Sequence, residues 1–571
     1  MPRRGADGRR HRGGGLGALK GVGLPFSAGC SIMGAMAGRK KAHTGGTGSS
    51  LLAKGASLSV LTLCSRVLGL LREMTKARLL GTSSYSDAFG IAFMIPNLFR
   101  RLFAENSVSV AFIPTFKGYL EEATTPQLKR TAEEFVSATF TVVLSLTAAV
   151  AALGMVFAPQ VLRLFYADEG SIGEAVLLTR MMLHYLVVIS VAALYQGILN
   201  SLRIFSPSGF TPVLFNAAVI ASAWALRRVA GNAARAMAIG VIVGGIIQAA
   251  FQLPFVVKQG WRPRLVPLRR AFANAGCRRV FSLVGPTIIG MAGYQINDVV
   301  SSALATRAGE GVVSSLQYSL RLQELILGIC AVTVGTVILP DLAGYAKRED
   351  WGGFNTLLTG AIKAMVLICL PVTFYSLSMG ESLIALVFSG GAFGEESVAL
   401  TNSVFRLHIA GLLFIATNRI VSPAFYAQSD TKHPTAAGLI NFAVNIALAS
   451  LLCRRWGGRG IAFALSAASA ANTVALFVFL GRGKGGQVAG VVCSSLLYAL
   501  KLTLLSAVAA VPVLLLRGPL LALFSGHGKL IAHGLPVLIT GMVFCAMGVV
   551  LLAVTHDQVL HLLLAKIARR K

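Results

Sequence analysis

Long apolar runs recur along the whole chain, and no other feature of the sequence constrains the fold so strongly. A helix needs about 20 apolar residues to cross the roughly 30 Å hydrocarbon core of a bilayer, and about fourteen segments meet that length. They begin near Ser57, Asp87, Glu134, Ala175, Pro212, Ala233, Val280, Val312, Leu357, Thr401, Pro434, Gly460, Val491 and Leu530. The sequence therefore predicts an all-α polytopic membrane protein with about fourteen transmembrane helices.

Two parts of the chain carry the same landmarks in the same order, each recurring roughly 225 residues later, which indicates an internal duplication. The pairs are Pro114 of "FIPTFKGY" with Pro340 of "LPDLAGY", Pro212 with Pro434, and Arg227–Arg228 with Arg454–Arg455. We expect two pseudo-symmetric six-helix halves, at 57–265 and 266–485. Segment 486–571 adds a helix pair and a basic tail, and segment 1–56 is basic, Gly-rich and expected to be disordered.

Basic residues in the loops predict the orientation of the chain in the membrane. The stretch from Lys258 to Arg279, between the sixth and seventh expected helices, contains several Lys and Arg residues and no carboxylate. Lys and Arg in short loops mark the cytoplasmic side, so this loop and both termini are expected there. The pairs Arg227–Arg228 and Arg454–Arg455 oppose this topology, because they fall near loops that it places outside.

The net charge of +30 raises the question of a nucleic-acid partner. Its positive residues are spread over loops and membrane segments, without the aromatic platform or basic helix face of nucleic-acid-binding proteins. A basic surface that faces anionic membrane lipids accounts for the charge better. We expect contacts with membrane lipids, no nucleic acid, and a monomer.

The sequence lacks the usual motifs of enzymes that act on phosphorylated lipids or nucleotides. Its eight cysteines show no metal-ligand spacing, no HExxH occurs, and "GRGKGG" lacks the Lys-Ser/Thr pair of a phosphate-binding loop. A membrane enzyme that acts on polyprenyl diphosphate also needs arginines, but it should carry paired carboxylates for metal or a large catalytic domain. We expect a transporter that is not an enzyme and has no cofactor.

Arginines concentrate in the first two expected helices, where they are costly. Each Arg at a helix centre costs about 2.5 to 3.5 kcal/mol of insertion free energy, so several that face lipid would cancel insertion. Arg66 lies between apolar segments, and Arg100 follows a helix-breaking proline. Lys76 and Arg78 have a second interpretation, in which they lie at a helix end and extend to the interface; for Arg101 we favour this role. Guanidinium groups in a cavity match the donors that a diphosphate requires.

The motifs "SRVLGLLRE", "SDAFGIAFMIPNLFRRLFAE" and "AFIP" resemble the N-terminal signature of the MurJ (MviN) lipid II flippases, a family of the multidrug/oligosaccharidyl-lipid/polysaccharide exporter superfamily. The resemblance implies a flippase of the bacterial cytoplasmic (inner) membrane. Its substrate would be lipid II, the undecaprenyl-diphosphate-linked peptidoglycan precursor, moved from the cytoplasmic to the outer leaflet by alternating access for cell wall synthesis and cell shape. Another polysaccharide-lipid or drug exporter of the same superfamily is the alternative.

The resemblance also implies which residues bind the substrate. The functional arginines of the family fall on Arg66, Arg72, Arg100 and Arg321, its acidic residue of "DAF" falls on Asp87, and Glu324 follows Arg321 by one turn. We expect the arginines to hold the diphosphate and sugar, and Asp87 and Glu105 to pair with them when the cavity is empty. Asn106 stands where the family has Gly, which makes the turn near Glu105 less typical.

Some members of the family use a cation between the seventh, eleventh and twelfth helices. Asp298 and the i, i+4 pair Asn441 and Asn445 offer oxygen ligands for sodium there. The acid of the family's seventh helix comes about one turn later, where this chain has Ser301. Packing amides are the alternative interpretation of the two asparagines, and we favour it slightly. Either a sodium ion or the membrane potential would then drive transport.

Overall fold

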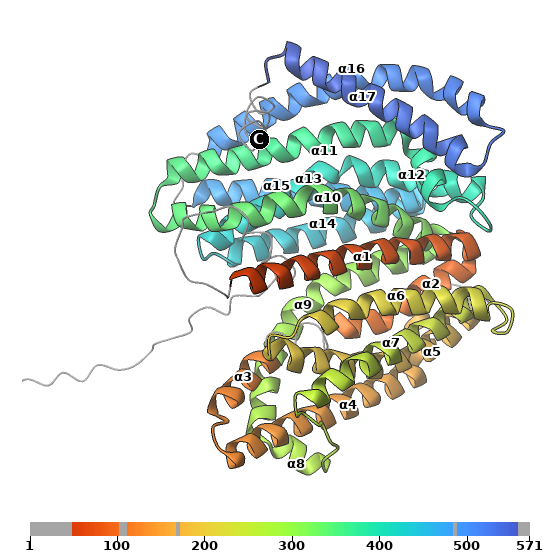
Figure 1. Cartoon of the computed structure of the whole chain (residues 1–571). Helices are drawn as coiled ribbons and strands as arrows, with labels where there is room; N and C mark the ends of the chain where they lie inside the picture. Colours follow the sequence, from red (N-terminus) through yellow and green to blue (C-terminus); the bar gives the residue numbers. More distant parts are fainter. Residues whose placement is uncertain (1–47, 102–110, 167–171, 484–487, 558–571) are drawn as a thin grey trace, which may run out of the picture.

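The computed structural model describes residues 48–101, 111–166, 172–483 and 488–557, and the regular elements in these ranges are helices (Figure 1). They are α1 (Gly48–Leu80), α2 (Ser84–Phe99), α3 (Ile113–Glu122), α4 (Pro126–Leu162), α5 (Ile172–Ser201), α6 (Ser206–Leu226), α7 (Ala233–Lys258), α8 (Leu268–Ala273), α9 (Ala275–Arg307), α10 (Val312–Lys347), α11 (Trp351–Phe388), α12 (Glu395–Ala410), α13 (Leu412–Ala427), α14 (Lys432–Trp456), α15 (Gly458–Arg482), α16 (Val488–Phe524), the π-helical turn η5 (Leu530–Gly534) and α17 (Leu535–Val554). The predicted all-α fold class is confirmed.

Fewer of the described helices meet the length and apolarity of a membrane span than the sequence predicted. Within the described ranges, nine helices are long and apolar enough to cross a bilayer, or ten if the bent pair α12 and α13 forms one span. The expected count of about fourteen is therefore not confirmed by length and apolarity alone. Every expected start nevertheless lies inside a different helix or helix pair, and α2, with 16 residues, is shorter than a full span.

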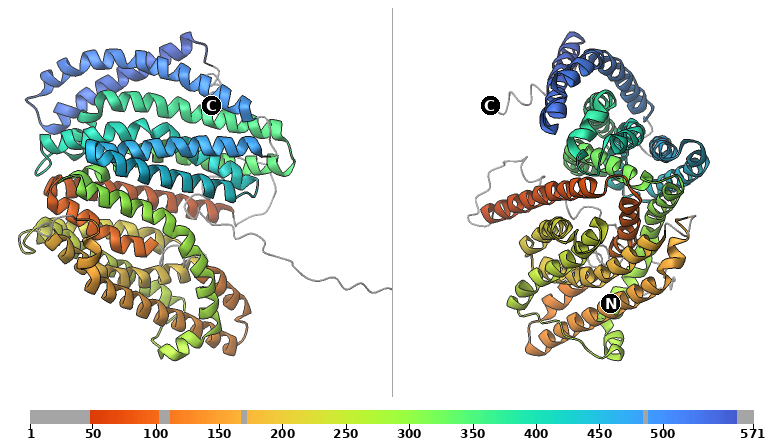
Figure 2. Two further views of the ribbon diagram at one scale, coloured as in Figure 1. Left: turned by 180° about the vertical axis from the view of Figure 1, so that it is seen from behind. Right: turned by 90° about the vertical axis from the view of Figure 1, so that its right-hand side faces the viewer.

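The helices form two bundles that lie side by side with their axes roughly parallel (Figures 1 and 2). The first contains α1, α2 and α4 to α7, with close packing of α6 on α7 and of α5 on α7. The second contains α10 to α15, and α9 runs between the two. Helices α16 and α17 pack on α11 at the outer edge of the second bundle.

The first helix starts earlier than the sequence suggested. It begins at Gly48, not near Ser57, because Leu51, Leu52 and Ala53 favour helix despite the small residues around them. Residues 1–47 of the expected tail lie outside the described residues. The start of α1 and the end of α17 lie at the same end of the bundle, together with α8 in the basic loop (Figure 1).

The break between α12 and α13 has a local cause. The two helices meet at an angle of 41° at Gly411. A Cβ at this glycine would come within 2.4 Å of Ser466 Oγ of α15, so only glycine permits this approach. Ser466 Oγ donates to the carbonyl of Leu407, which satisfies a backbone group near the bend. The bend brings His408, which is buried, to the wall between the two bundles.

Candidate functional site

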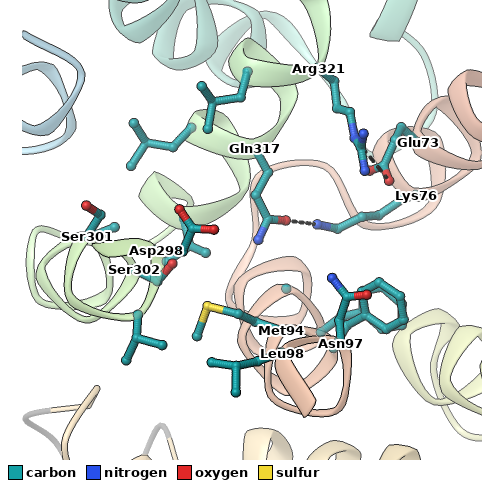
Figure 3. Close-up of a pocket in the computed structure, with 18 of the residues that line it drawn as sticks. Glu73, Lys76, Met94, Asn97, Leu98, Asp298, Ser301, Ser302, Gln317 and Arg321 are labelled. Atoms are coloured by element: carbon teal, nitrogen blue, oxygen red, sulfur yellow. Dashed lines mark hydrogen bonds and ion pairs between the residues drawn. The ribbon is translucent and has the colours of Figure 1, made fainter. Parts of the chain in front are cut away.

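A cavity of about 460 Å³ lies between the two bundles, with α1 and α2 on one side and α9 and α10 on the other (Figure 3). Its wall combines apolar side chains such as Phe93 and Leu316 with charged ones. Four of the lining residues are basic and three are acidic: Arg72, Lys76, Arg101, Arg321, Glu73, Asp298 and Glu324. Charges of both signs in one interior cavity between bundles are typical of a transport pathway.

Glu73 joins the arginines of the two bundles. Its Oε1 accepts a hydrogen bond from Arg72 Nη2 at 2.7 Å and lies 3.9 Å from Arg321 Nε. Arg321 also donates through Nη1 to Glu324 Oε2 at 2.9 Å, one helical turn further along α10. The Arg72 guanidinium lies over the rings of Phe93 and Phe215, 5.8 and 5.9 Å from their centroids. These contacts fix both guanidinium groups at the cavity wall.

Lys76 is almost completely buried, with 2% of its surface exposed. Its Nζ donates to Gln317 Oε1 of α10 at 2.9 Å and lies over the rings of Phe89 and Tyr318 (Figure 3). The interpretation of Lys76 as an interface anchor is therefore wrong: α1 continues to Leu80, which places this lysine on the face toward the second bundle. Gly90 of α2 leaves the room that Gln317 needs, since a Cβ there would lie 2.7 Å from Gln317 Nε2.

Arg101 faces the cavity rather than the interface. Its Nη1 lies 3.8 Å from Asp298 Oδ2 of α9, a contact that joins the first bundle to α9. Both side chains are substantially exposed, at 44% and 61%, so the pair is open to solvent or ligand and contributes little to stability. Asp298 stands across the cavity from Lys76 and Gln317 in Figure 3.

Two of the expected arginines lie near this cavity without lining it. The Arg66 guanidinium is next to Gly328 of α10, where a Cβ would lie 2.9 Å from Nη1. Gly328 is about two helical turns beyond Arg321, so Arg66 extends the row of guanidinium groups along the α1 and α10 interface. Arg100 donates through Nε to Asn97 Oδ1 at 2.9 Å, and Asn97 itself lines the cavity.

Asp87 has a different environment from the one expected. Its carboxylate accepts hydrogen bonds from the backbone N–H groups of Gly311 and Ser314, at 2.8 and 2.7 Å, and from the Ser314 hydroxyl. A carboxylate at the start of a helix satisfies otherwise unpaired N–H groups and favours the helix dipole. Asp87 of α2 thus caps α10 across the two bundles, and among the described residues it forms no ion pair with a cavity arginine. Glu105 lies outside the described residues.

The expected sodium ligands do not converge. Asn445 donates to Asn297 Oδ1 at 2.8 Å and to Ser301 Oγ at 3.1 Å, whereas Asp298 faces the cavity. The Asn445 Oδ1 atom is buried without a hydrogen-bond partner among the described residues. No hydrogen bond or ion pair joins Asn441 to Asp298 or Asn445 in the part of the chain that the structure describes. The Asn445 amide nitrogen faces the oxygens of Asn297 and Ser301, so these contacts match amide packing between α9 and α14.

The sequence reasoning did not select Glu73, Lys76 or Gln317 as site residues. One signal was present: Lys76 follows Glu73 by three residues and Arg72 by four, the spacings at which side chains are neighbours on a helix. Gln317 precedes Arg321 by one turn on α10 and could have been found in the same way. No pattern in a single sequence shows that α1 and α10 meet.

A family described as "Lipid II flippase MurJ" matches residues 76–526. The "Probable lipid II flippase MurJ" of Treponema pallidum is 46% identical over 512 residues, which cover 89% of this chain and 97% of that protein. The "Lipid II flippase MurJ" of Burkholderia cenocepacia is 33% identical over 443 residues, 75% of this chain and 83% of that protein.

Solved structures show the same fold. "Lipid II flippase MurJ, inward closed conformation" superposes with a TM-score of 0.71 at 22% identity, covering 88% of this chain and 99% of that chain. An inward-facing multidrug resistance MATE transporter of the MOP superfamily gives 0.61 at 14% identity, over 74% and 95%. At these identities the likeness concerns the fold alone. The sequence match to the family and to its curated relatives is extensive, and it confirms the resemblance seen in the N-terminal motifs: the chain belongs to the lipid II flippase MurJ family.

Proposed function

We propose that this protein is a lipid II flippase, which moves the undecaprenyl-diphosphate-linked peptidoglycan precursor from the cytoplasmic to the outer leaflet. The observation that carries the proposal is the cavity between the bundles, in which Arg72 of one bundle and Arg321 of the other both approach Oε1 of Glu73. Membership of the MurJ family supports the same substrate. The protein acts as a transporter and not as an enzyme, since only the position of the lipid changes.

The ion pairs of the cavity suit the binding and release of an anion. Arg72 and Arg321 share Glu73, Arg321 also binds Glu324, and Arg101 approaches Asp298. The phosphate oxygens of a diphosphate can replace carboxylate oxygens as acceptors for these arginines, with the bidentate geometry that guanidinium groups favour. When the diphosphate leaves, the ion pairs between the carboxylates and the arginines form again. This exchange gives the loaded and empty states different contacts, which coupled transport requires.

Alternating access needs a seal that opens, and the bundles are joined at the end opposite the start of α1. There Asp87 caps α10, Ser84 N donates to Glu310 Oε1 at 2.7 Å, and Thr82 Oγ1 lies 2.8 Å from Ser397 Oγ. The cavity of about 460 Å³ is within the range of pockets for drug-sized ligands. A disaccharide-peptide head group is larger, so we infer that the bundles separate to admit it and that this seal breaks to release it.

The orientation follows from the basic loop and the shared position of the chain ends. We propose that the end of the bundle with Gly48, Val554 and α8 faces the cytoplasm of a bacterial inner membrane and that the protein acts as a monomer among anionic lipids. A sodium ion or the membrane potential would supply the energy. Labelling of a cysteine placed at Arg269 from outside intact cells would contradict this orientation.

The function is tested by depletion of the protein from a bacterium that depends on it, with a labelled precursor. Lipid-linked disaccharide should accumulate on the cytoplasmic leaflet, and the wild-type chain should restore its arrival outside. Matched rescue with Arg72→Gln, which removes a cavity cation, should fail, whereas Arg228→Gln, which removes a cation far from the cavity, should succeed. A precursor that reaches the outer leaflet at the normal rate without this chain would refute the proposal and favour another exported lipid or drug.

A further inference from the structure

A second hollow, here called the lateral crevice, lies between the two bundles at the end opposite the start of α1. It has a volume of about 480 Å³ and is bounded by α1 and α6 of the first bundle and by the end of α11 with Lys529 of the second. No residue lines both the lateral crevice and the central cavity among those that the structure describes. The crevice is therefore a separate feature, and the transport mechanism proposed above does not use it.

The walls of the lateral crevice are mostly apolar. On α1 they run from Leu68 through Leu71 and Met74 to Arg78, and on α6 they include Ile220 and Ala221. Ten residues of helix correspond to about 15 Å along the α1 axis. The volume lies within the range of pockets that hold one drug-sized ligand. A hollow of this length and lining suits a single hydrocarbon chain that lies parallel to the helices.

Two cations stand at one end of the crevice, and no carboxylate lines it in the described part of the chain. Lys529 Nζ donates to the carbonyls of Ser389 and Val387 at the end of α11, at 2.7 and 3.4 Å. An ammonium has three donors, so one is left for a ligand. Arg78 and Lys529 both line the crevice, and burial lowers the pKa of Lys529, as does the charge of Arg78.

The position of Arg78 is set by its neighbours. Its backbone carbonyl accepts a hydrogen bond from Ala392 N at 2.9 Å, and its guanidinium lies over the ring of Trp224, 5.9 Å from the centroid. Arg227 lies over the same ring at 4.9 Å. Tryptophan gathers at the depth of the lipid head groups, so Trp224 marks where the bilayer surface meets the crevice. The two cations lie at that depth and the apolar wall extends below it.

We propose that the lateral crevice binds one anionic glycerophospholipid, with its phosphate between Arg78 and Lys529 and one acyl chain along the α1 wall. A positive head-group site above an apolar slot matches the two ends of such a lipid. The volume favours a lipid with separate chains of ordinary length over a long polyprenyl chain. The bound lipid contacts α1 and α6 of one bundle and α11 of the other, so it holds the bundles together at this end. The proposal does not depend on which substrate the central cavity transports.

Native mass spectrometry of the purified full chain tests this. The protein is titrated with phosphatidylglycerol and with phosphatidylcholine of the same acyl chains. Wild type should retain one phosphatidylglycerol in preference to phosphatidylcholine. The double variant Arg78→Gln, Lys529→Gln should bind phosphatidylglycerol about thirtyfold more weakly. The control variant Arg228→Gln, Arg455→Gln removes two exposed cations outside the crevice and should bind as wild type does. Equal affinity of the two double variants would overturn the proposal.

A second variant separates loss of the site from loss of the fold. Ala221→Phe fills the apolar slot from an exposed position and leaves both cations in place. It should weaken phosphatidylglycerol binding at least tenfold without lowering the thermal unfolding midpoint. Unchanged binding in this variant would show that the acyl chain lies elsewhere. A competition with polyprenyl diphosphate is the last arm: if that lipid displaces phosphatidylglycerol at lower concentration, the crevice is a site for the diphosphate lipid, and the proposed occupant is wrong.

Discussion

Arg321 of α10 and Glu73 of α1 face each other between the two bundles, with 3.9 Å between Nε and Oε1. Arg72 binds the same carboxylate at 2.7 Å, so one acid serves an arginine from each bundle. Glu73 therefore holds the place that an anionic substrate group would take between two guanidinium groups. Glu73 is the last residue of the motif "SRVLGLLRE", but the sequence analysis gave it no role in the site.

Arg321→Lys should abolish rescue of a flippase-depleted cell while protein levels in the membrane stay near normal. The guanidinium contacts Glu73 through Nε and Glu324 through Nη1, and one ammonium cannot reproduce both contacts or bind a phosphate bidentately. We expect at least a tenfold fall in transport, measured by arrival of labelled precursor outside. Arg228→Lys is the control and should be tolerated, because this exposed arginine lines neither the cavity nor the crevice. Full activity of Arg321→Lys would show that this residue acts as a simple positive charge.

Glu73→Gln should separate binding from turnover. In this variant, Arg72 and Arg321 lose the carboxylate that pairs with them after the diphosphate has left. A hydrogen bond to a charged group contributes about 1.5–3 kcal/mol, so its loss is measurable. The diphosphate lipid should bind roughly tenfold more tightly to the purified variant, while transport in cells slows. Glu324→Gln, at a more exposed carboxylate, should show a smaller effect of the same sign. Weaker binding in Glu73→Gln would mean that the carboxylate helps to position the arginines rather than competing with the substrate.

The contact between Lys76 and Gln317 can be broken without changing either residue. A methyl group in Gly90→Ala would displace the Gln317 amide, which removes the partner of a buried ammonium. The loss of about 1.5–3 kcal/mol exceeds the helix-propensity gain of roughly 1 kcal/mol, so the variant should be destabilised. Gly118→Ala, where nothing lies within 4 Å, should instead be neutral or slightly stabilised. Thermal unfolding of the two variants in the same detergent gives the comparison, and equal midpoints would contradict it.

Much of this fold was predictable because apolar length reports directly on membrane spans. The arginines in the first helices were predictable because each has a large insertion cost, and Arg72 and Arg321 do line one cavity. The partners were not predictable. Lys76 looked like an interface anchor because its distance from the helix end suggested exposure, and only the meeting of α1 with α10 buries it. Asp87 looked like a partner for arginine because a single sequence does not show which helix start lies beside it.

Asp87→Asn should weaken the seal at the end opposite the start of α1. An amide keeps one acceptor oxygen and replaces the other with a donor, which cannot accept from the N–H of Gly311 or from Ser314. We expect a cysteine at Thr82 to react several times faster with a polar maleimide in the variant, after replacement of the exposed native cysteines. A slower reaction would show that other contacts, such as Ser84 with Glu310, hold this end closed. Asp87→Glu is the conservative comparison.

The cap that Asp87 places on α10 has a mechanical consequence. Asp87 accepts a hydrogen bond from the backbone N–H of Ser314, and Arg321 contacts Glu73 in the cavity. Ser314 and Arg321 are seven residues apart on one uninterrupted helix, about 10 Å along its axis. A helix is stiff over that distance, so α10 couples the position of the Asp87 cap to the position of Arg321 in the cavity. When the hydrogen bonds from α10 to Asp87 break and the start of α10 moves, the Arg321 guanidinium two turns along must move with it. Conversely, substrate binding that displaces Arg321 must displace the start of α10.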